Sequence, residues 1–278
     1  MPRQLTKVVA IVNYVSTNGI RLAYERAGNG KPVLLIMGQA AGANVWRMHQ
    51  VPALVEAGYE AITFDNRGIP PSDAPPGDYS LADLVTDTEG LIQALGAGPC
   101  HVVGTSLGAL VAAVLAVKRP DLVTSCVLMA MRSRCDAFRR ALCAGERALA
   151  RSGVPVPSAY GTPMSVLQMF SSATVNDDAA ISSWLDIYEL SSTRRAAASG
   201  QNAIDLTTDR RNMLKSVQVP CRAIAFSEDF VCPPHLCAEV AEAIPNCDYV
   251  EIGPCGHAGY LESPDEVNKA IIEFLDKN

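Results

Sequence analysis

The residues with the clearest chemical potential lie in the stretch Gly104-Thr105-Ser106-Leu107-Gly108, which has the form of a nucleophile elbow. Residues 100–103 form a short apolar run typical of a buried strand, and residues 107–117 form an apolar helix. Ser106 occupies the turn between them, where the sharp bend strains the backbone and exposes the hydroxyl. Side chains larger than those of Gly104 and Gly108 would collide with the neighbouring strand and helix. The pattern predicts that Ser106 is a nucleophile.

A serine hydroxyl is a weak nucleophile near neutral pH, so this interpretation requires a base that accepts its proton. Among the four histidines, His257 lies in the glycine-rich loop of residues 253–260, after the last strand-like run. A flexible loop allows an imidazole to reach across the end of a sheet. His49, His101 and His235 are expected to be structural or solvated, since they fall in a helix, in a strand and after a Pro-Pro turn. His257 is therefore the predicted base.

The third member of such a group is an acid that orients the imidazole and fixes its tautomer. Asp229 is favoured because it follows the strand-like run 221–226 and lies between Ser106 and His257 in the chain. Glu228 is a near alternative, and Asp136 is a more remote one. The resulting order of nucleophile, acid and base differs from the orders in the chymotrypsin and subtilisin folds.

Over nearly its whole length, the chain resembles members of the α/β-hydrolase superfamily. Four segments carry the resemblance: the elbow, Ser227-Glu228-Asp229 with Pro233, Cys255-Gly256-His257 followed by Glu262-Ser263-Pro264, and Phe64-Asp65-Asn66-Arg67-Gly68 with Ser72-Asp73. The resemblance implies an α/β fold with a mostly parallel eight-stranded sheet flanked by helices. It also implies a helical cap inserted after the sixth strand. The resemblance does not identify the substrate, because this scaffold supports many reactions.

One departure from the family pattern concerns the loop after the third strand. Many relatives have His-Gly there, whereas this chain has Met37-Gly38. By family position, the backbone amides of Gln39 and Leu107 are the expected donors to an oxyanion. Because main-chain groups supply both donors, replacement of the histidine is compatible with catalysis.

Alternating apolar runs and helical patterns support this architecture. The segments 12–15 and 20–24, separated by Asn18-Gly19, are expected to form an antiparallel hairpin. Further strands are expected at 33–37, 61–64, 101–103, 123–129, 222–226 and 249–252, and a final amphipathic helix at 264–275. Residues 1–130 and 216–278 are assigned to the core domain and 131–215 to the cap.

The cap interval is mostly helical in pattern and should cover Ser106 and its partners. Residues of the cap at helical spacing are candidates for the wall of an acyl or ring-shaped pocket, although such a stripe also fits an ordinary core. Arg194 or Arg195 is a candidate for pairing with a substrate carboxylate, the alternative being an exposed helix face. The pocket candidates are Trp46, Met164, Leu167, Phe170, Trp184 and Tyr188, with Met169, Leu185 and Ile187 on the same stretch.

Composition excludes several classes of protein. The net charge of −6 argues against a nucleic-acid partner. An odd count of nine cysteines, several of them in strand-like runs, favours a reduced cytoplasmic protein over a disulfide framework. The chain has no membrane-length apolar run, and no His or Cys cluster has metal-ligand spacing, so neither a membrane association nor a metal or cofactor is expected. For the oligomeric state, a monomer and a homodimer are both compatible with the sequence.

The combined expectation is a serine hydrolase that cleaves a carboxylic ester, lactone or thioester of a small apolar molecule through an acyl-enzyme. One alternative is a cyclase, acyltransferase or carbon–carbon lyase of a biosynthetic pathway on the same scaffold. Absence of hydrolysis of simple esters would favour this alternative. A further alternative is a ligand-binding relative with slow or no turnover. Melting shifts with a metabolite, without turnover, would favour the latter.

Overall fold

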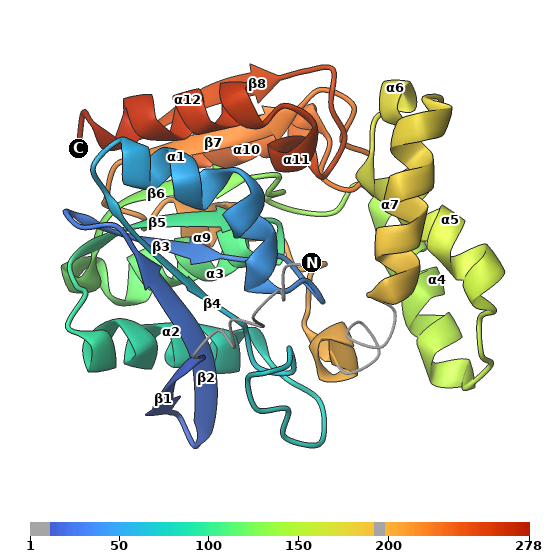
Figure 1. Ribbon diagram of the computed structural model, residues 1–278, viewed down its shortest axis with the longest axis horizontal. Coiled ribbons are helices and arrows are strands. Elements are labelled where there is room, and N and C mark those ends of the chain that lie inside the picture. The colour runs from blue at the N-terminus through green and yellow to red at the C-terminus, as the bar shows by residue number, and fades with distance from the viewer. Residues whose placement is uncertain (1–11, 192–197) are drawn as a thin grey trace, which may run out of the picture.

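The computed structural model describes residues 12–191 and 198–278, and its centre is one eight-stranded sheet (Figure 1). The strand order is β1-β2-β4-β3-β5-β6-β7-β8. β2 is antiparallel to both of its neighbours, and the pairs from β4 to β8 are parallel. The expected α/β class with a mostly parallel sheet is confirmed. The strands are β1 (Asn13–Thr17), β2 (Ile20–Ala27), β3 (Pro32–Ile36), β4 (Glu60–Phe64), β5 (Cys100–Thr105), β6 (Val123–Met129), β7 (Cys221–Phe226) and β8 (Cys247–Ile252).

The predicted hairpin joins β1 to β2 through Asn18 and Gly19, which both have positive φ, at 47° and 75°. Two residues with positive φ form the turn whose twist matches that of antiparallel strands. The final helix α12 (Pro264–Leu275) has the predicted bounds, and the predicted stripe of Val267, Ala270, Ile271 and Phe274 is buried. Both local predictions are confirmed.

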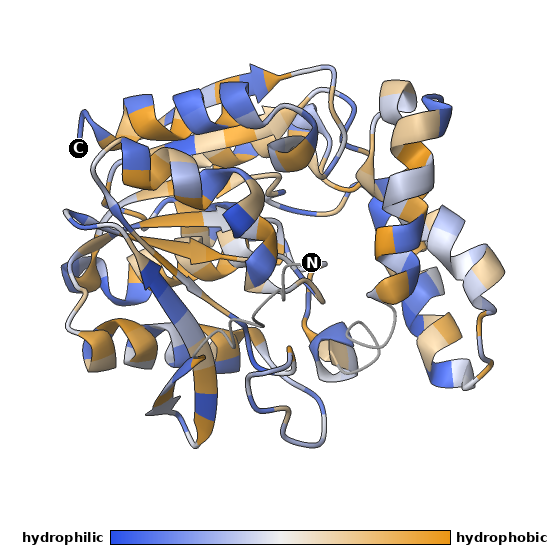
Figure 2. Ribbon diagram, in the orientation of Figure 1, coloured by the Kyte–Doolittle hydropathy of each residue, from blue (hydrophilic) through white to orange (hydrophobic). Residues whose placement is uncertain are grey.

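Helices cover the two faces of the sheet, because successive strand residues point to opposite faces. Leu34 and Ile36 of β3 join the core formed with α2 (Leu81–Leu95), α3 (Leu107–Lys118), α9 (Arg211–Leu214) and α10 (Pro234–Ala243). Val33 and Leu35 join the opposite core, formed with η1 (Ala43–Met48), α1 (Gln50–Glu56) and α12. Figure 2 shows hydrophobic residues along the central strands and mixed colours on α12, as expected for a buried sheet and an amphipathic covering helix.

A helical region lies between β6 and β7, as the resemblance implies, and its helices α4 to α7 stand beside the sheet in Figure 1. α4 begins after Asp136, whose side chain accepts a hydrogen bond from the Arg139 amide, and ends at Gly153 with φ 66°. Its described helices are α4 (Ala137–Ser152), α5 (Ser158–Met169), α6 (Ser172–Val175), α7 (Asp178–Leu190), η3 (Ala198–Ala203) and α9. The short helices outside it are η2 (Pro120–Leu122) and α11 (Gly259–Glu262).

The carboxyl ends of the parallel strands position the candidate site. β3 leads to Gln39, β5 to Ser106, β7 to Asp229 and β8 to His257. In open α/β sheets, ligands bind beyond these ends. Among the described helices, none has the length and apolarity needed to cross a membrane.

Candidate active site

Ser106 occupies a strained turn between β5 and α3, with φ 54° and ψ −117°. Its amide donates a hydrogen bond to the Met129 carbonyl at 2.9 Å, which anchors the turn to the end of β6. A Cβ at Gly104 would lie 2.4 Å from the Gly108 carbonyl oxygen, and one at Gly108 would lie 2.1 Å from the Ile36 oxygen. Both glycines are therefore required by backbone contacts. A residue with such a backbone conformation costs on the order of 1–3 kcal/mol and is often found at functional sites.

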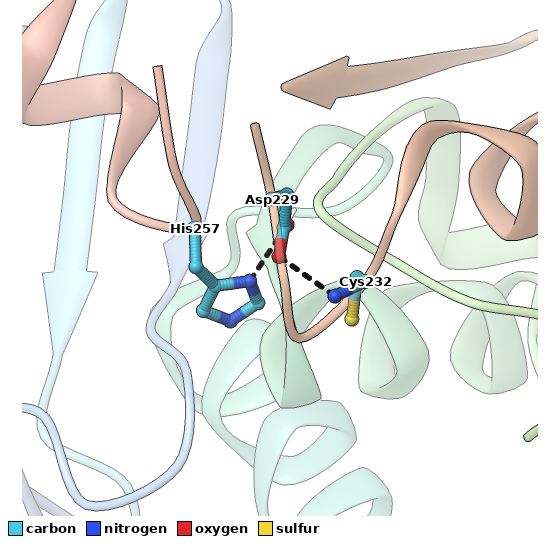
Figure 3. Close-up of side chains that lie close together, drawn as sticks. All are labelled: Asp229, Cys232 and His257. Atoms are coloured by element: carbon cyan, nitrogen blue, oxygen red, sulfur yellow. Dashed lines mark hydrogen bonds and ion pairs between the residues drawn. The ribbon is translucent and has the colours of Figure 1, made fainter. Parts of the chain in front are cut away.

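His257 and Asp229 form a buried hydrogen-bonded pair (Figure 3). The distance between His257 Nδ1 and Asp229 Oδ2 is 2.8 Å, and the residues are 5% and 2% exposed. Asp229 Oδ1 accepts hydrogen bonds from the Val231 and Cys232 amides, each at 2.7 Å. Both carboxylate oxygens are thus occupied, and the carboxylate fixes the orientation of the imidazole.

The two alternative acids have other partners. Glu228 is exposed, and its Oε2 accepts hydrogen bonds from the amide and hydroxyl of Ser172, which lower the pKa of its carboxyl. Asp136 caps α4 and forms an ion pair with Arg139 at 3.0 Å. The structure places Asp229, and neither of these carboxylates, against His257.

The other histidines also lie in different surroundings. His101 is buried in β5, with Nδ1 2.8 Å from the Ser125 hydroxyl, and burial lowers the pKa of its imidazole. His235 is exposed and lies 3.7 Å from Asp136, whereas His49 precedes α1. None of the three lines the cavity described below.

The loop after β3 approaches the elbow closely. A Cβ at Gly38 would lie 3.3 Å from the Ser106 Cβ, so glycine allows the two backbones to meet. Within residues 12–191 and 198–278, the Gln39 amide has no hydrogen-bond acceptor. The Leu107 amide belongs to the first residue of α3, where helix amides have no intrahelical partner. Both amides are available to a ligand oxygen.

Gln201, in η3, supports this loop, and the sequence analysis missed it. Its Oε1 accepts a hydrogen bond from the Ala40 amide, and its Nε2 donates one to the Arg67 carbonyl, each at 2.9 Å. The side chain of Gln201 is fully buried. The Gly-Gln-Asn sequence around it is an ordinary loop composition, so no local signal identifies it.

Ser106, Leu107, Gln39 and His257 line one cavity of about 480 Å³. The helical region supplies the opposite wall, with polar and charged groups among its apolar ones. The residues contributed by α4 and α5 are Arg139, Leu142, Cys143, Glu146, Arg147, Ala150, Ser165, Gln168 and Met169.

The predicted pocket residues lie elsewhere, apart from Met169. Trp46 is fully buried against Tyr260, with ring centroids 5.2 Å apart. Phe170 packs on Trp184 and Tyr188, with centroids at 4.7 and 6.0 Å. Met164 and Leu167 are exposed, and Leu185 and Ile187 do not line the cavity. The apolar stripe of α5 and α7 forms the joint core of these helices, which leaves the polar side of α5 facing the cavity.

Arg194 and Arg195, the candidate partners of a substrate carboxylate, lie outside the described residues.

One group of side chains offers three possible metal ligands close together. Atoms of Asp229, Cys232 and His257 lie within 4.8 Å of one another. Burial raises the pKa of the Cys232 thiol far above its usual range, whereas metal binding requires the thiolate. The two Asp229 oxygens are also engaged in the hydrogen bonds already described. The arrangement is suited to orienting an imidazole for proton transfer.

The helical region is tied to the loops that carry Asp229 and His257. The Glu262 carboxylate accepts hydrogen bonds from the Gly256 amide at 2.6 Å and from the Ser171 amide at 3.0 Å. The Ala258 amide donates to the Met169 carbonyl at 2.8 Å. With the Glu228–Ser172 hydrogen bonds, these contacts fix the corner between α5 and α6 against both loops.

Comparison with known proteins agrees with this geometry. Residues 31–264 match the family described as alpha/beta hydrolase fold. The chain is 39% identical over 258 residues to the Mycobacterium tuberculosis protein named "Putative non-heme bromoperoxidase BpoC", with 92% of this chain and 98% of that protein covered. A crystal structure with that name has a TM-score of 0.84 at 38% identity and covers 92% of this chain and 96% of the other.

A thermophilic esterase from Thermogutta terrifontis has a TM-score of 0.78 at 26% identity, with 96% and 97% of the two chains covered. The family match runs from the strand before the Gly38 loop, through the Ser106 elbow, to a point beyond the His257 loop. With this span and this sheet order, the chain belongs to the alpha/beta hydrolase fold family.

Proposed function

We propose that this protein is a serine hydrolase that cleaves a carboxylic ester, lactone or thioester through an acyl-enzyme. One observation carries the proposal: the strained Ser106 elbow shares a cavity with His257, whose Nδ1 is held by buried Asp229. A hydroxyl, an imidazole and a carboxylate in this relation are the parts of a nucleophilic triad. Residues 131–215 serve as the cap over this site.

In the proposed reaction, His257 Nε2 takes the Ser106 proton as the hydroxyl attacks the substrate carbonyl. The Gln39 and Leu107 amides stabilise the oxyanion of the tetrahedral intermediate, and each such donor is typically worth about 3 kcal/mol of barrier. His257 then gives the proton to the leaving group. Water, activated by the same imidazole, releases the acid and restores the Ser106 hydroxyl.

A fluorophosphonate probe tests this proposal, because it reacts with activated serines. Mass spectrometry should find the probe on Ser106, and Ser106→Ala should abolish both labelling and hydrolysis of p-nitrophenyl esters. The matched control is Ser152→Ala, which removes an exposed serine of α4 and should change neither. Folded wild-type protein that takes up no probe on Ser106 would refute the proposal.

The similarity to BpoC favours a second activity of the same acyl-enzyme. Hydrogen peroxide in place of water would attack the acyl carbonyl, giving a peracid and the free Ser106 hydroxyl, and the peracid would oxidise bromide. Bromination that requires hydrogen peroxide, a carboxylic acid and Ser106 would support this second activity. Bromination that persists in Ser106→Ala would contradict it.

A further inference from the structure

Arg132 is a cation that lines the same cavity as the proposed nucleophile. It lies three residues beyond the end of β6, the strand whose Met129 carbonyl anchors the Ser106 amide. A rigid strand end therefore positions its backbone relative to the elbow. Arg132 was not among the predicted site residues, although a charged residue in the loop that follows a buried strand is a recognisable signal in such sheets.

The Arg132 guanidinium has few good hydrogen-bond acceptors among the described residues. One terminal nitrogen donates to the Val231 carbonyl at 2.8 Å, and the other polar contacts are to thiols, those of Cys232 and Cys143 at 3.7 and 3.6 Å and that of Cys135. Nε is buried without a hydrogen-bond partner. A guanidinium has five N–H donors, and thiol sulfur is a weak acceptor.

Within the part of the chain that the structure describes, Arg132 has no carboxylate in direct contact. It forms no ion pair with a carboxylate there. Burial raises the pKa of the Cys232 and Cys143 thiols, so both stay neutral near pH 7. The carboxylate that interacts with Arg132 at longer range is Glu146, which lines the same cavity; burial raises the pKa of its carboxyl and the charge of Arg132 lowers it. Arg132 is half-buried, and a partly desolvated charge is stabilised when a ligand of opposite charge joins it.

Two other arginines of the cavity wall are already neutralised. Arg139 forms an ion pair with Asp136 and contacts the rings of Phe138 and Phe230, with its guanidinium carbon 5.3 and 5.2 Å from their centroids. Arg210 lies 4.0 Å from Asp205 and donates to backbone carbonyls. Arg147, a third arginine of this wall, forms no ion pair within the described residues and donates from Nε to the Cys143 carbonyl at 3.3 Å. Arg132 differs from these arginines in having a buried Nε without a hydrogen-bond partner, which leaves it available to a ligand.

We propose that the substrate carries a carboxylate, besides the carbonyl group that Ser106 attacks, and that Arg132 binds this carboxylate. This inference rests on the proposed hydrolase function and specifies its substrate class. Arginine matches the planar geometry of a carboxylate and can bind both of its oxygens. The cavity volume of about 480 Å³ suits a small molecule with both groups. Arg132 is thus a specificity-determining residue.

Pairs of esters that differ only in a terminal carboxylate provide the test. The substrates are the mono-p-nitrophenyl esters of adipate and pimelate, compared with p-nitrophenyl hexanoate and heptanoate. Wild-type protein should prefer the charged member of each pair. Arg132→Gln should lower kcat/KM for the charged esters about 10- to 100-fold, the loss expected when a charged hydrogen bond is removed. It should leave the neutral esters and fluorophosphonate labelling within about threefold.

Arg151→Gln is the matched control, because it removes the same charge from an exposed position at the end of α4. It should leave the preference unchanged. Arg132→Lys keeps the charge and should retain part of the preference for charged esters. This variant provides the test if Arg132→Gln does not fold. An equal loss with charged and neutral esters would overturn the inference, since it would assign Arg132 to support of the Val231 backbone. Retention of the preference in Arg132→Gln would also overturn it.

Binding separates this inference from the hydrolase proposal. The adipate half-ester is titrated calorimetrically into Ser106→Ala and into Ser106→Ala with Arg132→Gln. Weaker binding to the double variant supports the inference. It does so even if no ester is hydrolysed, because the absence of hydrolysis would refute only the hydrolase proposal. Equal binding, or no binding to either variant, overturns the inference even if the neutral esters are cleaved.

Discussion

Replacement of Asp229 by asparagine separates the proposed catalytic role of the carboxylate from its structural role. Asp229 Oδ1 accepts the Val231 and Cys232 amides, and Oδ2 faces His257 Nδ1. An asparagine can keep its carbonyl oxygen toward the two amides, so the loop stays satisfied. Its NH₂ group then faces His257 and favours the tautomer with the proton on Nε2, which cannot accept the Ser106 proton. A loss of kcat of about 10⁴-fold, or about 5.5 kcal/mol of barrier, is expected.

Asp229→Ala provides the stability comparison. Alanine removes the acceptor of two amides, and each buried donor left unsatisfied costs about 1–3 kcal/mol. The free energy of unfolding should therefore fall by about 2–6 kcal/mol in the alanine variant. The asparagine variant should lose far less.

The assay combines p-nitrophenyl ester kinetics with urea denaturation of the same preparations. Glu228→Gln is the control, because this exposed neighbour contacts Ser172 and not His257. Its kcat should stay within about threefold of the wild-type value. The reasoning fails if Asp229→Asn keeps kcat within about tenfold of wild type while its fold is intact, or if Glu228→Gln shows the large loss.

Two further predictions concern buried groups away from the cavity. Asp87→Ala should lower the free energy of unfolding by about 3–5 kcal/mol in urea denaturation, because Arg67 and Asp87 form a buried two-bond ion pair at 2.6 and 2.7 Å. Asp121→Ala, which breaks an exposed pair with Arg119, should have a much smaller effect, and equal effects would contradict the argument. Burial lowers the pKa of His101, so the folded protein binds fewer protons than the unfolded chain, and stability should fall as the pH drops below about 6.5. His101→Gln should reduce this slope in urea titrations between about pH 7.5 and 5, and an unchanged slope would assign it to other groups.

Local signals explain how far the sequence could predict the fold. The hairpin at Asn18-Gly19 and the helix 264–275 have strong turn and periodicity signals, and the structure confirms both. The elbow and the loops of Asp229 and His257 follow strands whose carboxyl ends share one edge of the sheet, so their proximity follows from topology. Their catalytic roles stay predictions.

The wall of the cavity could not be predicted in the same way. Phe170, Trp184 and Tyr188 have the spacing of an apolar helix face, but the sequence does not say which neighbour that face meets. In the structure, α5 and α7 bury these residues against each other, so Gln168 and Ser165 face the cavity instead. Gln201 gives no local signal, because its importance depends on contacts with Ala40 and Arg67 from distant parts of the chain.

The contacts of Glu262 limit how this protein can open for a ligand. A rigid swing of α5 away from the sheet would break the hydrogen bonds of Ser171 and Met169 to the segment around His257, and would disturb the imidazole at the same time. An opening that leaves the segment around His257 in place therefore requires displacement of parts farther from the junction of α5 and α6, such as α4.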